Sequence, residues 1–274
     1  MKQQFKTEWE RMISGRMLWI AIIAGCTISL IQIIMEVYPA SENIIKYYSG
    51  RSGEPKSLFT YWIGMNAISP YGVIYRTVLP ILAMMPHALS YHMDIKSGYV
   101  KNIYTRTKKN NYLVAKYVVT FLGGGIAVVI PYLLNLIISA CMLPALTPIR
   151  NGQFQSASSL FQEILYSEPL VYLLIQFVIL FIFAGVFATT VLAATYIVDN
   201  IFLLSMVSFI LWYGLKMIYR CMIFEGIHYK IDPEIYVKMW DTSYKMYGLI
   251  LLPVLFGTIS FAFYYINGVK SDAL

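Results

Sequence analysis

Residues 91–116 form the most basic segment of this 274-residue chain, and their types suit either membrane orientation or the docking of a partner. The segment holds one acid, Asp94, against six cations: Lys96, Lys101, Arg106, Lys108, Lys109 and Lys116. Long apolar runs flank it, and Lys and Arg resist transfer across a bilayer, so we expect a cytoplasmic link between two spans. An acid at the start of a helical stretch and a cationic end would also provide a docking surface.

The sequence lacks the short patterns that mark common catalytic sites. It has no G-x-x-x-x-G-K-[ST] pattern for binding ATP, no H-E-x-x-H pattern for zinc and no G-x-S-x-G pattern for a nucleophilic serine. Its histidines and cysteines are scattered along the chain, at His87, His92, His228, Cys26, Cys141 and Cys221. We therefore predict no catalytic, metal-binding or cofactor-binding residues in this chain.

The composition is that of a membrane protein. Hydrophobic residues make up 58% of the chain and charged residues 13%, whereas soluble domains carry about 25% charged residues. Several apolar runs reach the ~20 residues that a helix needs to cross a bilayer. The net charge of +7 fits cationic loops beside anionic lipid headgroups, so we expect membrane lipid and not nucleic acid as a partner.

These runs predict an all-α polytopic membrane protein with one transmembrane domain over residues 1–274. We place six spans at about residues 17–37, 71–91, 112–143, 170–198, 201–218 and 247–268. Lys and Arg are dense before the first span and in residues 91–116. This bias predicts a multi-pass protein of the inner or plasma membrane with both termini in the cytoplasm.

Two segments outside the spans have helical patterns of their own. Residues 2–16 predict an interfacial amphipathic helix whose polar side carries Glu8 and Arg11. Its apolar face is formed by Phe5, Trp9, Met12 and Ile13. Asp232 and Pro233 predict the start of a short extracellular helix before the last span, because Asp caps helices and Pro favours their first position.

Polar and helix-breaking residues within the spans give further expectations. Ser69 and Pro70 predict the start of the second span, with Ser as the N-cap and Pro at the first helical position. Pro80 and Pro86 predict that this span is bent, and we expect Arg76 in it to extend outward to the interface. Three consecutive glycines at residues 123–125 predict close helix packing. The other ionisable groups near the spans lie close to span ends, at Glu36, Asp94, Asp199 and Lys216, which argues against intramembrane catalysis or proton coupling.

This layout resembles the membrane subunit, or permease, of an ABC-2 type ABC transporter. The local resemblance lies in D-I-K-S-G-Y-V-K-N-I-Y-T-R-T-K-K-N-N-Y-L-V-A-K. Asp94, Gly98, Arg106 and Lys116 match the family's acid, its glycine four residues later, its Arg and the Lys that enters the third span. The family usually has Glu where Asp94 stands, and often Pro-Ser before the Arg, where this chain has Thr105.

The resemblance implies an exporter subunit that is not itself an enzyme. Two permease subunits, identical or different, would pair above two separate ATPase subunits that bind ATP and Mg²⁺. The implied ATPase-coupling residues are Asp94, Gly98, Lys101, Arg106, Lys109 and Lys116. The spans are rich in Phe, Tyr, Trp and Met, so we expect an apolar or amphipathic cargo: a peptide such as an antimicrobial peptide, a lipid-linked compound or a drug. A secondary carrier and a non-transporting membrane assembly factor are the alternatives.

Overall fold

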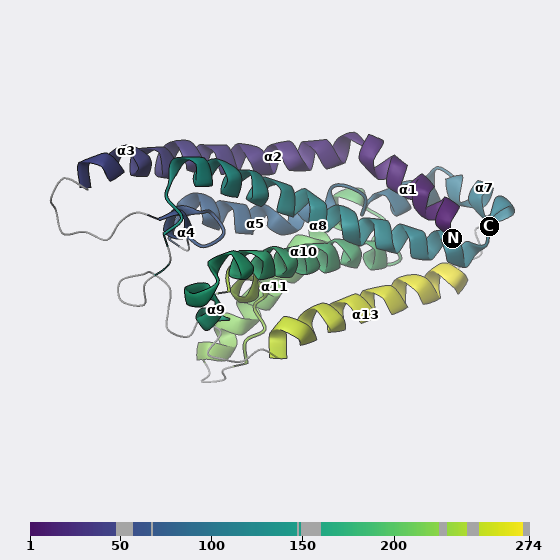
Figure 1. Cartoon of the computed structure of the whole chain (residues 1–274). Helices are drawn as coiled ribbons and strands as arrows, with labels where there is room; N and C mark the ends of the chain where they lie inside the picture. Colours follow the sequence, from purple (N-terminus) through teal and green to yellow (C-terminus); the bar gives the residue numbers. More distant parts are fainter. Residues whose placement is uncertain are drawn as a thin grey trace.

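The computed structural model of the chain is a bundle of helices (Figure 1). It describes residues 1–47, 57–66, 68–146, 148, 160–224, 229–239 and 247–270. Within these ranges the chain forms helices and turns and contains no β-strand, which confirms the predicted all-α class.

Five helical stretches in the described part of the chain are long and apolar enough to cross a membrane. The first runs over Arg16–Glu42 and begins with α2 (Arg16–Gln32). The other four are α8 (Lys109–Met142), α10 (Pro169–Ala194), α11 (Ile201–Phe224) and α13 (Tyr247–Lys270). These five agree with five of the six predicted spans, with ends that differ by a few residues.

The predicted second span is the exception. Ser69 and Pro70 start α5 (Pro70–Met84) as expected, with the Ser69 hydroxyl accepting the Gly72 N–H at 3.2 Å. The helix then ends, and a turn over residues 85–89 leads to α6 (Ser90–Lys96). Pro86 lies in that turn and cannot donate a backbone hydrogen bond, so the chain breaks where a bend was predicted. At 1.5 Å per residue, α5 is about 22 Å long, short of the ~30 Å hydrocarbon core.

The first span extends further than predicted. A π-helical turn, η1 (Ile33–Val37), follows α2, and α3 (Tyr38–Tyr47) continues the helix beyond residue 37, where the predicted span ends. Pro39 stands two residues after the end of the wide π turn, and proline lacks the N–H that a regular helix would need at that position. The helical path therefore passes a proline without ending.

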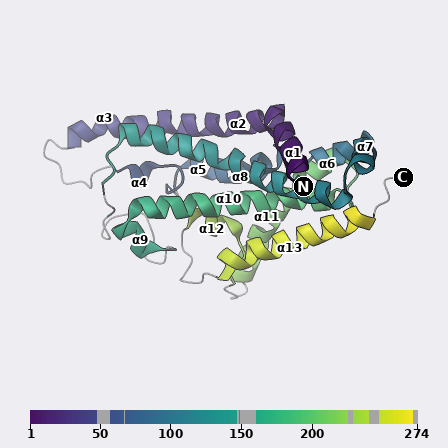
Figure 2. The ribbon, with the colours of Figure 1, turned by 45° about the vertical axis from the view of Figure 1, so that its right-hand side comes forward.

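Short helices gather at the two ends of the bundle (Figures 1 and 2). One end, here the α7 end, carries α1 (Lys2–Ser14), α6, α7 (Tyr99–Arg106) and the last turns of α13. The opposite end, here the α12 end, carries α3, α4 (Leu58–Tyr61), α9 (Gln162–Ser167) and α12 (Pro233–Lys238).

The long helix α8 lies at the centre of the packing, against α1, α2, α5, α10 and α13. The glycine triplet allows this close approach. A Cβ on Gly124 would lie 2.7 Å from Ala188 Cβ of α10 and 2.9 Å from the Ala83 carbonyl oxygen of α5. A Cβ on Gly123 would lie 2.5 Å from Met12 Sδ of α1. The prediction of close helix packing at the triplet is confirmed.

The short helix before the last span exists, but it is tucked into the bundle. Its predicted cap is confirmed, since the Glu234 N–H donates to Asp232 Oδ1 at 2.9 Å. Tyr236 and Val237 are buried, and the Tyr236 ring stacks on Phe183 of α10 with ring centroids 6.1 Å apart. The helix therefore does not lie on a surface as an exposed amphipathic element.

Candidate functional site

The predicted coupling segment folds as two helices joined by a glycine in the left-handed region. Gly98 has a φ of 71°, which L-residues with a side chain rarely adopt, and it precedes the first residue of α7. A Cβ on Gly98 would meet no atom within 4 Å. Glycine therefore allows the backbone to change direction between α6 and α7. The space where a side chain would begin is open.

Three of the predicted coupling residues lie at or near the surface of the α7 end. Lys101 and Arg106 are exposed on α7. Lys109, at the start of α8, donates from Nζ to the Val269 carbonyl oxygen of α13 at 2.8 Å and lies over the Tyr104 ring. Lys101 and Arg106 are thus available to a partner, whereas Lys109 also ties the segment to the last helix.

Asp94 and Lys116 lie inside the protein, where they bind each other. Lys116 Nζ is 2.6 Å from Asp94 Oδ2, and the Tyr112 hydroxyl donates to the same oxygen at 2.8 Å. The exposed fraction is 4% for Asp94 and 0% for Lys116. Asp94 also lies near the C-terminal end of α6, so it does not begin the helix that follows Gly98. These two residues hold the segment to α8.

The N-terminal helix completes this buried group, here called the α1 charge cluster. Glu8 of α1 is fully buried, with Oε2 2.9 Å from Lys116 Nζ and 3.1 Å from His87 Nε2. Arg11 bridges the two acids: it donates to Glu8 Oε1 at 2.9 Å and to the two Asp94 oxygens at 2.7 and 3.1 Å. The cluster comprises Glu8, Arg11, His87, Asp94, Tyr112 and Lys116.

The electrostatics of the α1 charge cluster favour ionised acids. Burial acts to raise the pKa of Glu8, but the hydrogen bond with His87 and the charges of Lys116 and Arg11 outweigh it and lower the pKa to about 2. Burial likewise acts to raise the pKa of Asp94, while hydrogen bonds from Arg11 and the charge of Lys116 lower it below its ordinary value. Two carboxylates therefore face two cations.

The sequence did not reveal the roles of Glu8, Arg11 and His87. Glu8 and Arg11 were assigned to the polar side of a helix lying in the interface, yet Glu8 and Met12 are the buried residues of α1. Ile13, predicted on the apolar face, is 40% exposed. The signal was present in the spacing, because Glu8, Arg11 and Met12 follow the i, i+3, i+4 pattern of a single helix face.

A second buried group, here called the α12 charge cluster, lies towards the other end of the bundle. Arg76 of α5 is 1% exposed and pairs with Glu234 of α12, with 3.4 Å between Nε and Oε1. The prediction that Arg76 extends outward to the interface is wrong, because Glu234 offers it a buried partner. Lys216 of α11 and Lys238 of α12 also pair with Glu234, and Asp232 caps α12 beside it.

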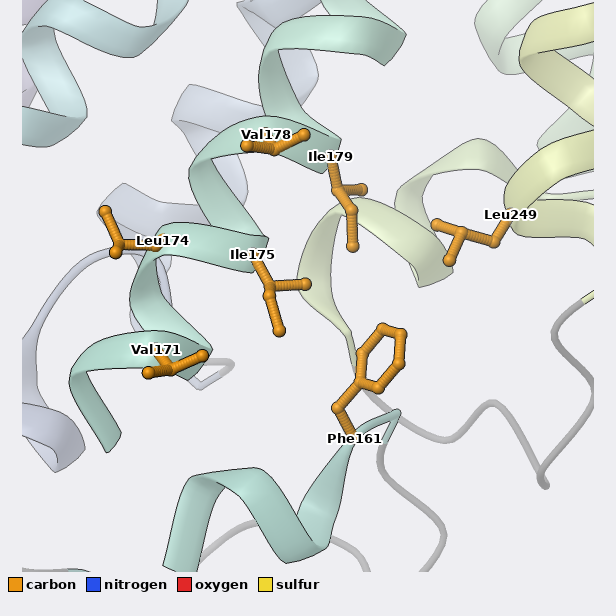
Figure 3. Close-up of a pocket in the computed structure, with 7 residues that line it drawn as sticks. All are labelled: Phe161, Val171, Leu174, Ile175, Val178, Ile179 and Leu249. Carbon is orange, nitrogen blue, oxygen red and sulfur yellow. The ribbon is translucent and has the colours of Figure 1, made fainter. Parts of the chain in front are cut away.

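A third candidate is an apolar groove on the outer side of α10 with a volume of about 270 Å³ (Figure 3). Its lining is entirely apolar: Phe161, Val171, Leu174, Ile175, Val178, Ile179 and Leu249. In the described part of the chain, no group of three or more His, Cys, Asp or Glu side chains is placed to hold a metal ion. The groove offers no polar group for catalysis.

The fold and these sites define an all-helical membrane protein with buried charge clusters at both ends of its bundle. Comparisons with protein-family models, with curated proteins and with solved structures each find no match for the chain. Its function is therefore inferred from its own residues.

Proposed function

We propose that the chain is the permease subunit of an ATP-driven ABC exporter, with α6 and α7 as its docking element for a separate ATPase subunit. One observation carries this proposal. The α6–α7 pair presents Lys101 and Arg106 to solvent, while Asp94 and Lys116 fix the same pair to α1 and α8. A force applied to α7 by a partner would thus reach the long helix α8 through buried ionic contacts.

The two ends of the bundle also fit the orientation in the membrane that such a subunit needs. We propose that α5 and the turn after it make a sixth crossing, because Pro70 follows the α4 segment at the α12 end and Lys96 lies at the α7 end. Six crossings return both chain ends to one side. The cations of α1 and α7 assign that side to the cytoplasm of the inner or plasma membrane.

The partners follow from this assignment. ATP and Mg²⁺ would bind the ATPase subunits, since the chain itself has no P-loop pattern. A second permease subunit, identical or different, would complete the path. The exposed side chains of the long helices are largely apolar, which favours an apolar or amphipathic cargo: a peptide, a lipid-linked compound or a drug.

Co-purification from native membranes tests the docking assignment. The tagged chain should retain a subunit that contains a P-loop, and the complex should hydrolyse ATP that the chain alone does not. Reversing two exposed charges, with Lys101→Glu and Arg106→Glu together, should lower the recovery of that subunit by about tenfold or more, because like charges at an interface cost several kcal/mol.

Arg220→Glu is the matched control, since Arg220 is exposed on α11 and lies outside the docking element. It should leave the recovery unchanged, with all variants compared at equal membrane expression. Full recovery of the ATPase subunit by the Lys101→Glu, Arg106→Glu variant would refute the docking assignment.

A proton-driven carrier is the second candidate, and Asp232 favours it. Burial raises the pKa of this carboxyl; the Glu234 backbone N–H acts to lower it, and the Glu234 charge raises it again, giving a pKa of about 6. Such a group could change protonation near neutral pH. A gene for a P-loop ATPase beside the gene for this chain would favour the exporter, whereas transport that persists after ATP depletion and stops with a protonophore would favour the carrier.

A further inference from the structure

The guanidinium of Arg76 is buried without a well-formed hydrogen bond. Its exposed fraction is 1%, and Nε, Nη1 and Nη2 make no hydrogen bond of good geometry within the described residues, although the Tyr132 side chain lies next to the guanidinium. The contact with Glu234 at 3.4 Å is an ion pair without hydrogen-bond geometry. Arginine stays charged in proteins, and a buried charge that lacks partners costs several kcal/mol. A native protein with such a group calls for a ligand or ion that satisfies it.

One carboxylate serves three cations at this site. Glu234 pairs with Arg76, Lys216 and Lys238, the last with 3.5 Å between Nζ and Oε1. Asp232, the other acid of the cluster among the described residues, accepts from the Glu234 N–H. The shared carboxylate leaves the Arg76 guanidinium without a well-formed hydrogen bond. An anionic group could supply the acceptor that Arg76 lacks.

The cluster is closed on one side and reaches solvent or lipid on the other. Arg76, Asp232 and Glu234 are buried, whereas the side chains of Lys216 and Lys238 are 19% and 25% exposed. Next to Lys216 on α11, Met217 is 57% exposed. Ile218 and Ile210 of the same helix are 52% and 59% exposed, so apolar surface adjoins the cationic entrance.

We propose that the α12 charge cluster binds the phosphate or carboxylate group of an amphipathic anion, which enters between Lys216 and Lys238 and reaches Arg76. The planar guanidinium can donate two parallel hydrogen bonds to such a group. The apolar part of the ligand lies along α11. This site is independent of the proposed ATPase and holds whether or not the chain is a permease.

Thermal unfolding of the purified full chain in a neutral detergent tests this site. The probes are phosphatidylglycerol, phosphatidylcholine of the same acyl chains, and inorganic phosphate, at one ionic strength. Phosphatidylglycerol should raise Tm in a saturable manner by about 5 °C, because a ligand that binds only the folded state stabilises it. Phosphatidylcholine should not, since its headgroup carries no net charge. An equal rise with inorganic phosphate would support the site and identify a free anion as its ligand.

Variants identify the residues that are responsible for the rise in Tm. Lys216→Gln with Lys238→Gln should remove most of the rise in Tm that phosphatidylglycerol causes, with each variant compared with itself without lipid. Arg220→Gln is the matched control, because Arg220 is exposed on α11 one turn beyond Lys216, and it should keep the full rise. Arg76→Lys should reduce the rise, since lysine keeps the charge and loses the bidentate geometry.

Two results would overturn the proposal. One is an equal rise in Tm, or none, with phosphatidylglycerol and phosphatidylcholine together with no effect of inorganic phosphate. The other is a rise with phosphatidylglycerol that is as large in the Lys216→Gln, Lys238→Gln variant as in the unmodified chain. Either would show that the α12 charge cluster does not bind an anionic ligand.

Discussion

The two buried charge clusters differ in how their members are paired. At the α7 end, Glu8 and Asp94 face Arg11 and Lys116, and every one of these four groups has hydrogen-bond partners. Towards the α12 end, Arg76 makes no hydrogen bond of good geometry within the described residues, and three cations share the carboxylate of Glu234. Burial is similar in the two places, so hydrogen-bond pairing is what distinguishes them.

The difference separates a structural joint from a binding site. A buried ionic network whose members are all paired holds its helices in one arrangement, and its loss exposes uncompensated charge. A buried cation without a well-formed hydrogen bond is stabilised by a group that supplies the missing acceptor. The first arrangement suits the contact between α1, α6 and α8, and the second suits a ligand between α5, α11 and α12.

The largest effect should come from removing the central cation of the α1 charge cluster. Lys116→Met leaves Glu8 and Asp94 close together, with Arg11 as the remaining strong cation. Breaking a buried ionic network in this way costs about 3–5 kcal/mol. We expect a large fall in Tm in detergent, whereas Lys101→Met, at an exposed lysine of α7, should change Tm little. Equal Tm values for the two variants would contradict the balanced joint.

A smaller effect should follow from Glu8→Gln, which keeps the shape of the side chain and removes its charge. Leaving Lys116 with Asp94 alone should cost about 1–3 kcal/mol at pH 7. The pKa of Glu8 is lowered from 4.5 to about 2 in the folded protein. Ionised Glu8 therefore stabilises the fold fully above pH 4.5, and this contribution is lost as the pH falls towards 2.

The loss of stability at acidic pH measures this contribution. His87, Arg11 and Lys116 contact Glu8 directly, and Asp94 lies on the other side of Lys116. These groups are present in both proteins, so a difference between the two pH curves reports on Glu8. Between pH 5 and 3, the free energy of unfolding should fall less steeply with pH in Glu8→Gln than in the unmodified chain. Parallel pH curves for the two proteins would show that Glu8 is not part of an ionised network.

The smallest effect should come from the corresponding change in the other cluster. Arg76→Met removes the cation that lacks a well-formed hydrogen bond and keeps similar volume, while Glu234 still pairs with Lys216 and Lys238. We expect Tm without added lipid to change by the equivalent of about 1 kcal/mol or less, because an apolar replacement of an unsatisfied buried charge is often neutral. A loss as large as that of Lys116→Met would show that the two clusters play the same structural role.

Local signals in the sequence predicted the local features of this fold. The apolar runs indicated the long helices, Ser69 with Pro70 and Asp232 with Pro233 marked helix starts, and the glycine triplet indicated close packing. Each of these depends on neighbours within a few residues. The helical class and the membrane-length helices could therefore be predicted.

The charge clusters could not be predicted in the same way, because their partners are distant in the sequence. Glu8 and Lys116 are 108 residues apart, and Arg76 meets Glu234 only through the folding of α12 into the bundle. A helix pattern shows which face a residue shares, but it does not show what covers that face.

The proposed function requires the α7 end to face the cytoplasm and the α12 end to face the outside. Two single-cysteine variants test this, in a background without Cys26, Cys141 and Cys221. Asn102→Cys lies on exposed α7 and leaves every cation of the basic segment in place. Tyr229→Cys replaces a residue that is 62% exposed near the start of α12.

A membrane-impermeant maleimide applied to intact cells is the most direct measurement. The proposed function predicts that it labels Tyr229→Cys and reaches Asn102→Cys only after the membrane is opened. Labelling of both cysteines from the outside, or of Asn102→Cys alone, would contradict the assignment of α6 and α7 as a cytoplasmic docking element.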